Sequence, residues 1–164
     1  MRHAYIEPSA WVERYYREAG TDLTNDLFDR LLRPRPSRLL CSRAGMTEVV
    51  SVLNRHRNAG RVTPAIFNLA YVYFEADSRM VRLLAVRNTQ SDASIRLLLA
   101  HNLNATDALH LQAALEVQSR LHTQGNTLLV FAADQRLLRA AQAEGLTTFN
   151  PETGTHAQLE ELLS

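Results

Sequence analysis

The sequence predicts an α/β fold in which a mostly parallel central sheet is covered by helices on both faces. Short apolar runs rich in Leu, Val and aromatic residues alternate along the chain with segments of helical periodicity. Proline and glycine residues mark the boundaries between them. A length of 164 residues with 46% hydrophobic residues suits one domain with a core of normal size. Strands that alternate with helices form βαβ units, and these units build parallel sheets.

The first half of the chain opens with a strand and a helix. Pro8 fits the first position of that helix, because its ring fixes φ and its missing N–H has no partner there anyway. The stretch "RPRPSR" at 33–38 breaks a second helix, and Gly60 ends a third. The elements expected here are a strand at 4–6, helices at 8–18 and 22–32, a strand at 38–42, a helix from about Met46 to Gly60, and a helix that opens at Thr63–Pro64.

The second half repeats this alternation. The run "NTLLVFAA" at 126–133 is the clearest strand, and Gly145 ends the helix that follows it. The elements expected here are strands at 80–86, 126–133 and 146–149 and helices at 90–101, 106–121, 134–145 and 155–163. We therefore expect one domain over residues 1–152 and a C-terminal tail over 153–164 with a short helix.

The charged residues exclude several classes of function. The formal net charge is +1, which does not suit a strongly basic nucleic-acid binder. All 18 basic residues are arginine, so the lysine that a P-loop, a Schiff base or a response-regulator receiver needs is missing. The arginine bias fits a GC-rich genome, or else phosphate recognition by guanidinium groups. No apolar run suits a membrane span or a secretory signal, and Cys41 has no partner for an internal disulfide. These features predict a cytoplasmic protein.

Acidic residues lie at or near the starts of four predicted helices. Glu7 follows the first strand, Glu48 the second and Asp134 the strand at 126–133, while Asp107 opens the helix at 106–121. Each one alone also suits a helix start, where acids cap free amides or favour the helix dipole. The carboxyl ends of parallel strands share one edge, however, so we expect the four carboxylates to gather and repel one another there. A divalent cation would relieve this repulsion, and oxygen ligands without a His or Cys cluster suit Mg²⁺ or Mn²⁺ rather than Zn²⁺.

Glu7 is unusual for its position. It occupies the N-cap site before Pro8, where Ser, Thr, Asp or Asn is preferred because a short side chain reaches the free amides. Glutamate is a poor capping residue, which favours a functional role for this side chain. Of the six histidines, none shows zinc-type spacing, and we interpret them as ordinary surface or core residues; His110 is the least certain because it lies close to Asp107.

Four segments resemble PIN-domain proteins of the VapC toxin type, and together they span residues 4 to about 152. They read "YIEPSAWVERYYREAG", "TEVVSVLNR", "NATDALHLQAALE" and "VFAADQRLLRAAQAEGLTTFNPE". The resemblance implies a three-layer α/β/α fold and a Mg²⁺- or Mn²⁺-dependent ribonuclease that a cognate antitoxin inhibits. The acidic residues of the family carry over onto Glu7, Glu48, Asp107 and Asp134, and its small hydroxyl residue onto Ser9.

The sequence departs from the family pattern at two positions. Glu7 stands where the family usually has Asp, and Ala132 stands where a hydroxyl residue is common. A longer ligand arm can displace a metal by enough to reduce activity. A catalytically weak or inactive PIN-fold module that binds RNA or protein is therefore an alternative to the nuclease.

The mechanism expected from these residues is metal-assisted hydrolysis of a phosphodiester, and the family resemblance implies that the substrate is RNA. Glu7, Asp107 and Asp134 would bind the metal, and Glu48 would orient the attacking water or bind a second ion. Arginines near the strand ends are candidates for binding flanking phosphates, although they suit a solvated helix surface equally well: Arg43, Arg136 and Arg139. A phosphatase for small phosphomonoesters is a third reading, but Glu7-Pro8-Ser9 lacks the paired acids that such enzymes carry after the first strand.

Aromatic residues suggest where partners bind. The stretch "AIFNLAYVYFEA" at 65–76 places aromatic side chains on more than one helix face, so either a neighbouring helix or a partner covers the second face. The family resemblance implies a homodimer and an antitoxin that uses the early helices, where Trp11, Tyr15 and Tyr16 lie.

Overall fold

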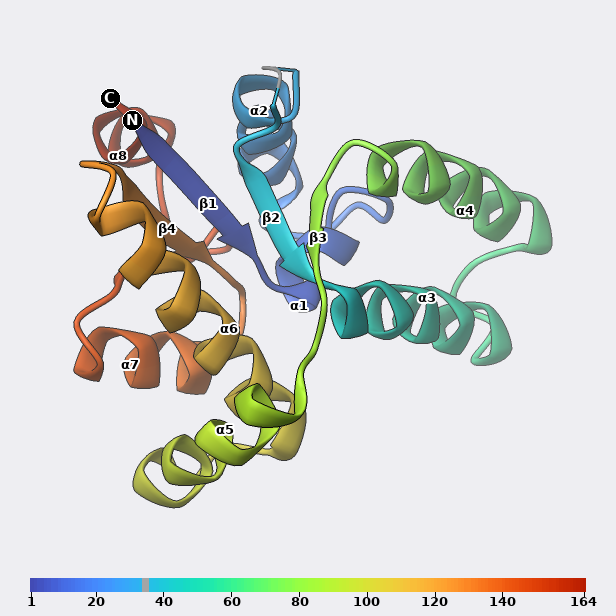
Figure 1. Ribbon diagram of the computed structural model, residues 1–164. Helices are drawn as coiled ribbons and strands as arrows, with labels where there is room; N and C mark the ends of the chain where they lie inside the picture. Colours follow the sequence, from blue (N-terminus) through green and yellow to red (C-terminus); the bar gives the residue numbers. More distant parts are fainter. Residues whose placement is uncertain (34–35) are drawn as a thin grey trace.

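A parallel sheet with helices on both faces organises the molecule, as the sequence predicts (Figure 1). The computed structural model describes residues 1–33 and 36–164. In these residues five strands pair in the order β3-β2-β1-β4-β5, and every pair is parallel. The predicted three-layer α/β/α class is confirmed.

The first strand lies at the centre of the sheet. The strands are β1 (Arg2–Ile6), β2 (Leu39–Ser42), β3 (Arg82–Leu84), β4 (Thr127–Phe131) and β5 (Thr147–Phe149). Tyr5 is in register with Leu40 on one side and with Val130 on the other. The three central strands are buried on both faces, which explains why they read as unbroken apolar runs.

Two apolar cores fill the two sides of the sheet. Side chains alternate along β1, so Ala4 and Ile6 enter one core and Tyr5 the other. The first core lies beneath α1 (Pro8–Val12), α2 (Thr21–Leu31), α3 (Arg43–Asn58), α4 (Pro64–Ser78) and α8 (His156–Leu163). The second lies beneath α5 (Asn88–His101), α6 (Ala105–His122) and α7 (Gln135–Ala143).

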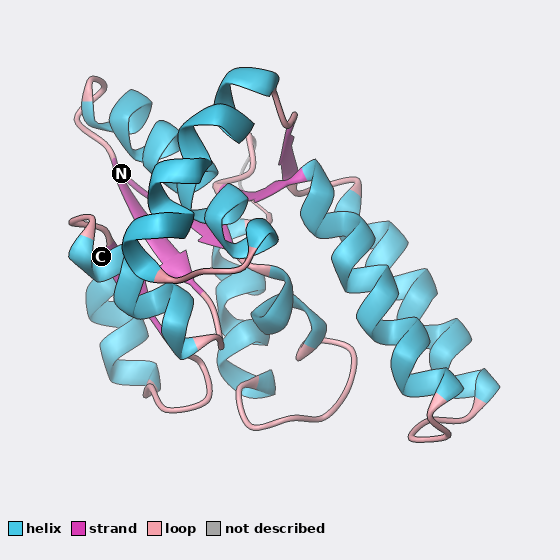
Figure 2. Ribbon diagram, turned by 90° about the horizontal axis from the view of Figure 1, so that it is seen from below, coloured by secondary structure: helices cyan, strands magenta, loops and turns pink. Residues whose placement is uncertain are grey.

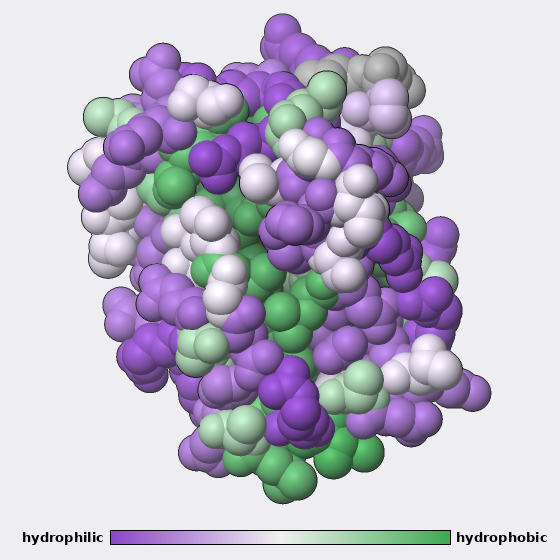
Figure 3. Space-filling model, turned by 60° about the vertical axis from the view of Figure 1, so that its left-hand side comes forward, coloured by the Kyte–Doolittle hydropathy of each residue, from purple (hydrophilic) through white to green (hydrophobic). Residues whose placement is uncertain are grey.

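The pair formed by α3 and α4 extends away from the sheet (Figures 1 and 2). Figure 3 shows one face of the molecule, on which apolar side chains run down the middle between polar ones and gather at the lower end. No helix in the described residues is long and apolar enough to span a membrane.

The first helix is shorter than the predicted range of 8–18, which was wrong beyond Val12. The reason is a closed loop after α1. The Glu13 carboxylate accepts a hydrogen bond from the Gly20 amide at 2.5 Å, and the Thr21 hydroxyl donates to the Glu13 carbonyl at 2.7 Å. Arg14 turns away to pair with Asp77 at 2.7 Å. These contacts replace the hydrogen bonds of a continuing helix.

One predicted strand is longer than the observed one, and one predicted helix break falls partly outside the described residues. The strand expected at 80–86 is reduced to Arg82–Leu84, because this edge strand pairs only with the short β2. The helix break expected at 33–38 includes residues 34–35, which lie outside the described part of the chain. In the C-terminal tail, α8 begins with a capping box between Thr155 and Gln158 and buries Leu159 in the first core.

Candidate active site

Glu7 connects the end of β1 to α1. Its side chain is 5% exposed, and its Oε2 accepts hydrogen bonds from the Ser9 amide at 2.9 Å and from the Ser9 hydroxyl. Glu7 is therefore the N-cap of α1. The predicted N-cap position is confirmed, and this glutamate caps the helix although glutamate is a poor capping residue in general, because its longer side chain folds back onto the second residue of the helix.

Ser9 fixes the position of the Glu7 carboxylate. While its hydroxyl donates to Glu7, the same oxygen accepts a hydrogen bond from the Ala133 amide at 3.1 Å. This contact ties α1 to the segment that follows β4. Ala132 is fully buried, and no side-chain hydroxyl is available at that position.

Asp107 lies in the first turn of α6, but its side chain does not cap the helix. Asn104 caps α6, accepting from the Asp107 amide at 2.8 Å, so the Asp107 side chain is not needed as a cap. Asp107 is 7% exposed, and its Oδ2 has no hydrogen-bond partner within the described residues. The guanidinium of Arg136 approaches this oxygen at 4.0 Å, which is too far for a hydrogen bond. A buried carboxylate oxygen without a partner is costly, and a bound cation or a water molecule would remove that cost.

Asp134 caps the helix that it begins, whereas Glu48 does not cap a helix. Asp134 caps α7 through Oδ1, which accepts from the amides of Arg136 and Leu137 at 2.7 and 2.9 Å. This leaves its second oxygen outside the cap. Glu48 is not a cap, because Ser42 caps α3. Its Oε1 instead contacts Nε2 of His110 at 2.8 Å.

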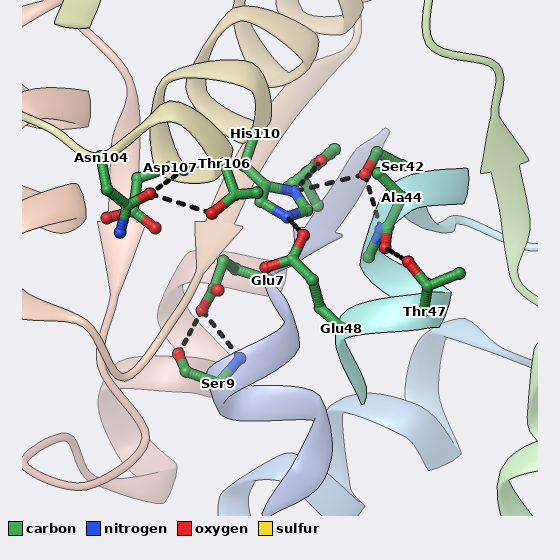
Figure 4. A network of polar contacts seen from close by, with 12 residues as sticks. Glu7, Ser9, Ser42, Ala44, Thr47, Glu48, Asn104, Thr106, Asp107 and His110 are labelled. Carbon is green, nitrogen blue, oxygen red and sulfur yellow. Dashed lines mark hydrogen bonds and ion pairs between the residues drawn. The ribbon is translucent and has the colours of Figure 1, made fainter. Parts of the chain in front are cut away.

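Sequence reasoning interpreted His110 as an ordinary residue, although as the least certain of the six histidines, and the structure places it against Glu48 of the cluster. It is 1% exposed and lies one helical turn after Asp107, where the two side chains share a face of α6 (Figure 4). Its Nδ1 lies 2.7 Å from the Tyr5 hydroxyl and 3.4 Å from the Ser42 hydroxyl. With Glu48 ionised, the contacts are satisfied when Nε2 carries the proton and donates to Glu48, while Tyr5 donates to Nδ1. The i, i+3 spacing from Asp107 was the signal that could have identified it.

A close approach at Gly45 makes this network possible. A Cβ at this position would lie 2.6 Å from the Cys41 sulfur and 3.1 Å from Cε1 of His110. Only glycine lets the start of α3 come this close to α6. The packing at Gly45 therefore holds His110 between β1 and the Glu48 side chain.

Burial and mutual repulsion raise the pKa values of the central acids. Burial raises the pKa of Glu7 from 4.5 to about 7, against the opposing effects of His110 and the Ser9 hydrogen bonds, and Asp107 adds to the rise. Burial also raises the pKa of Asp107, and the charges of Asp134 and Glu48 contribute in the same direction. The four predicted carboxylates are therefore close enough to influence one another.

The donor set suits a hard divalent cation, but it is not preformed. Among residues 1–33 and 36–164, no three His, Cys, Asp or Glu side chains are grouped closely enough to hold a metal ion as they stand. The cluster still offers carboxylate oxygens, the ligands that Mg²⁺ and Mn²⁺ prefer, and the free Oδ2 of Asp107 lies among them. Binding a cation requires some of these side chains to turn from their present hydrogen bonds.

Of the three predicted arginines, Arg136 is the one that approaches a carboxylate in the described residues, through its 4.0 Å contact with Asp107. Arg43 is the first residue of α3, and Arg139 lies on α7. Both are exposed. A role in phosphate binding stays a prediction for all three.

Comparison with known proteins shows similarity at the level of structure. No protein-family model and no curated protein sequence matches the chain. The crystal structure of PAE2754 from Pyrobaculum aerophilum is 16% identical with a TM-score of 0.65, and the match covers 99% of this chain and 98% of that one.

Two further matches are to assemblies. The structure of FitAB bound to an IR36 DNA fragment is 13% identical with a TM-score of 0.65, covering 93% of this chain and 98% of that one. FitAcB from Neisseria gonorrhoeae is 14% identical with a TM-score of 0.62, covering 92% and 99%. At these identities the comparison establishes the architecture: the chain has the PIN-like fold that its sequence resemblance implies.

Proposed function

We propose that the protein is a Mg²⁺- or Mn²⁺-dependent endoribonuclease and the toxin of a toxin–antitoxin pair in the cytoplasm. The observation that carries the proposal is the Asp107 carboxylate, which is buried and has an unpartnered oxygen in the described structure. The sequence resemblance and the PIN-like fold support the same conclusion.

We assign each residue of the cluster a role from its contacts in the structure. Glu7, Asp107 and Asp134 are the proposed metal ligands, and the bound cation would activate water and neutralise charge on the scissile phosphate. Ser9 holds the Glu7 carboxylate in place, while His110 holds Glu48 where it can orient a water molecule. Arg136, close to Asp107, is suited to bind a phosphate of the RNA.

Cleavage of RNA by purified protein tests the proposal. We expect cleavage of structured RNAs with Mn²⁺ and none with EDTA. Asp107→Asn should abolish cleavage, because the swap keeps the shape and removes the charge that a cation needs. Asp92→Asn, at an exposed position on α5, is the matched control and should keep full activity. Full activity in Asp107→Asn protein would contradict the mechanism.

The absence of a preformed ligand set in the described residues favours a second candidate, a PIN-fold module that binds RNA without cleaving it. Calorimetric titration with Mn²⁺ separates the two proposals. A nuclease should bind Mn²⁺ and lose that binding in Asp107→Asn, whereas a binding module should retain RNA affinity in EDTA.

A protein partner is part of the proposal. Five large apolar side chains on α4 are exposed: Ile66, Leu69, Tyr71, Val72 and Tyr73. They lie on the helix pair that extends from the sheet (Figure 2), which suits contact with an antitoxin or a second copy of the chain. Light scattering across a dilution series should show dimers that Leu69→Arg dissociates. An unchanged monomer mass for both proteins would remove the homodimer from the proposal.

A further inference from the structure

Two arginines and a histidine lie together at the amino-terminal edge of the sheet, opposite the carboxylates. His3, Arg38 and Arg82 belong to β1, the residue before β2, and β3 respectively, three neighbouring strands. The alternation of side chains puts all three on the face of Tyr5 and Leu40, which α6 covers. They line a cavity of about 550 Å³ together with Arg120 of α6.

The described residues neutralise this positive charge only in part. As far as residues 1–33 and 36–164 form it, the cavity lining contains no acidic residue. In the described part of the chain neither Arg38 nor Arg82 has a carboxylate within ion-pair distance, although Arg120 lies 3.5 Å from Glu116. Among the residues that the structure describes, the guanidinium of Arg38 donates to the main-chain carbonyls of Arg2 and Arg30 at 3.4 and 3.3 Å, which leaves part of its hydrogen-bonding capacity unused there.

His3 is a second residue of this cavity with unused hydrogen-bonding capacity. It lines the same cavity, is 7% exposed, and its Nδ1 has no hydrogen-bond partner among the described residues. Burial lowers the pKa of His3, and the charges of Arg82 and Arg38 lower it further, so both guanidinium groups lie near the ring. A buried ring nitrogen without a hydrogen-bond partner also carries a desolvation cost.

The rest of the cavity is apolar with a few amides. Leu40, Leu84, Val117 and Leu121 contribute aliphatic surface, and Gln124 and Asn126 contribute side-chain amides. A volume of about 550 Å³ is far larger than inorganic phosphate needs and falls within the usual range for organic ligands. Aliphatic walls suit the faces of a planar ring, and amides suit its polar edges.

We propose that this cavity binds a ribonucleoside monophosphate, with Arg38 and Arg82 on the phosphate and the nucleoside against the aliphatic wall. Guanidinium groups form charge-assisted, bidentate hydrogen bonds with phosphate oxygens. The site is separate from the carboxylate cluster. His3 and Glu7 lie at opposite ends of β1, about 13 Å apart along the strand at roughly 3.3 Å per residue. The inference therefore stands independently of the proposed nuclease.

Calorimetry in EDTA with 5′-AMP, GMP, CMP and UMP tests the proposal, because without a metal the carboxylate cluster repels nucleotides. At least one of the four should bind, and the matching nucleoside should bind at least about tenfold more weakly because it lacks the phosphate. Arg82→Gln should weaken binding by at least about tenfold. Arg61→Gln is the matched control, exposed beyond the end of α3 and away from the cavity, and should bind as the native protein does.

Three results would overturn the proposal. One is no heat of binding with any of the four nucleotides at millimolar concentration. Another is equal binding by Arg82→Gln and Arg61→Gln proteins when both unfold in urea like the native protein. The third is displacement of the nucleotide by a short oligoribonucleotide that binds more tightly through Arg82, which would make the cavity part of an RNA path. Asp107→Asn should leave nucleotide binding unchanged, so a failed nuclease assay and a failed cavity are distinguishable.

Discussion

Replacing Glu7 by Gln should stabilise the metal-free protein, although it removes a residue of the proposed site. The pKa of Glu7 rises from 4.5 to about 7 on folding because the carboxylate is buried. At about 1.4 kcal/mol per pH unit, this rise corresponds to a cost of about 3 kcal/mol when the group is ionised in the folded protein.

The cost depends on pH in a defined direction. Below pH 4.5 Glu7 is protonated in both states, so the carboxyl costs nothing. Between pH 4.5 and 7 the unfolded chain releases its proton first, and the free energy of unfolding falls as the pH rises. Above pH 7 the full cost applies. The neutral amide of Glu7→Gln avoids it and can still accept from the Ser9 amide.

Urea unfolding in EDTA measures the difference. At pH 8 the free energy of unfolding of Glu7→Gln should exceed that of the native protein by up to about 3 kcal/mol, and at pH 4.5 the two should agree. A difference of the same size at both pH values would refute the reasoning, since it would not arise from ionisation.

Glu13 supplies the matched control. Burial raises its pKa to about 7 as well, and its Oε1 has no partner in the described residues, but it lies in the loop after α1 and outside the carboxylate cluster. Glu13→Gln should also stabilise the protein at pH 8. Mn²⁺ should raise the melting temperature of the native and Glu13→Gln proteins and leave Glu7→Gln unchanged. An equal rise in Glu7→Gln protein would mean that Glu7 is not a ligand.

Three other substitutions test the packing around the cluster. Gly45→Ala should lower the free energy of unfolding in urea by about 1–3 kcal/mol, since its Cβ would lie 2.6 Å from the Cys41 sulfur. Adding Cys41→Ala should recover part of that loss. Undiminished stability of the single variant would contradict the close approach. Ser9→Ala should cost about 1–2 kcal/mol, because its hydroxyl joins α1 to the end of β4; no loss would mean that this link is dispensable. The free energy of unfolding of Glu7→Asp should stay within about 1 kcal/mol of the native value, since Asp134 shows that aspartate caps a helix in this protein. Calorimetry should still detect Mn²⁺ binding to this variant. Loss of that binding would show that the site requires the longer glutamate side chain.

The fold could be predicted from the sequence because parallel strands leave a strong signal. Strands such as β4 are buried on both faces, so their residues form unbroken apolar runs between helices. The edge strand was overestimated at 80–86 because its apolar residues exceed the length of the partner strand that pairs with it. The first helix was overestimated because the contact between Glu13 and Gly20 that ends it joins residues outside the helical repeat.

The site was predictable only where topology determines it. The gathering of acids follows from the shared edge of parallel strands, so Glu7 and Asp134 were placed correctly at helix starts. The role of His110 could not be read in the same way. Its partners Tyr5 and Glu48 are 105 and 62 residues away in the chain, so its i, i+3 spacing from Asp107 on the same helix was the one sequence signal that pointed to the cluster.

The central position of β1 has a consequence for synthesis of the protein. Arg2 pairs with Thr127 and Ile6 with Phe131, and the Glu7 amide donates to the Phe131 carbonyl at 3.0 Å. The strand β1 therefore cannot pair with β4 until residues 127–131 have been synthesised, and pairing between such distant segments makes folding slow. While the chain is being translated, Glu7 has no fixed place beside Asp107 or Asp134. A nascent chain on the ribosome, surrounded by RNA, carries its acidic residues in an unassembled form until nearly the whole protein has emerged.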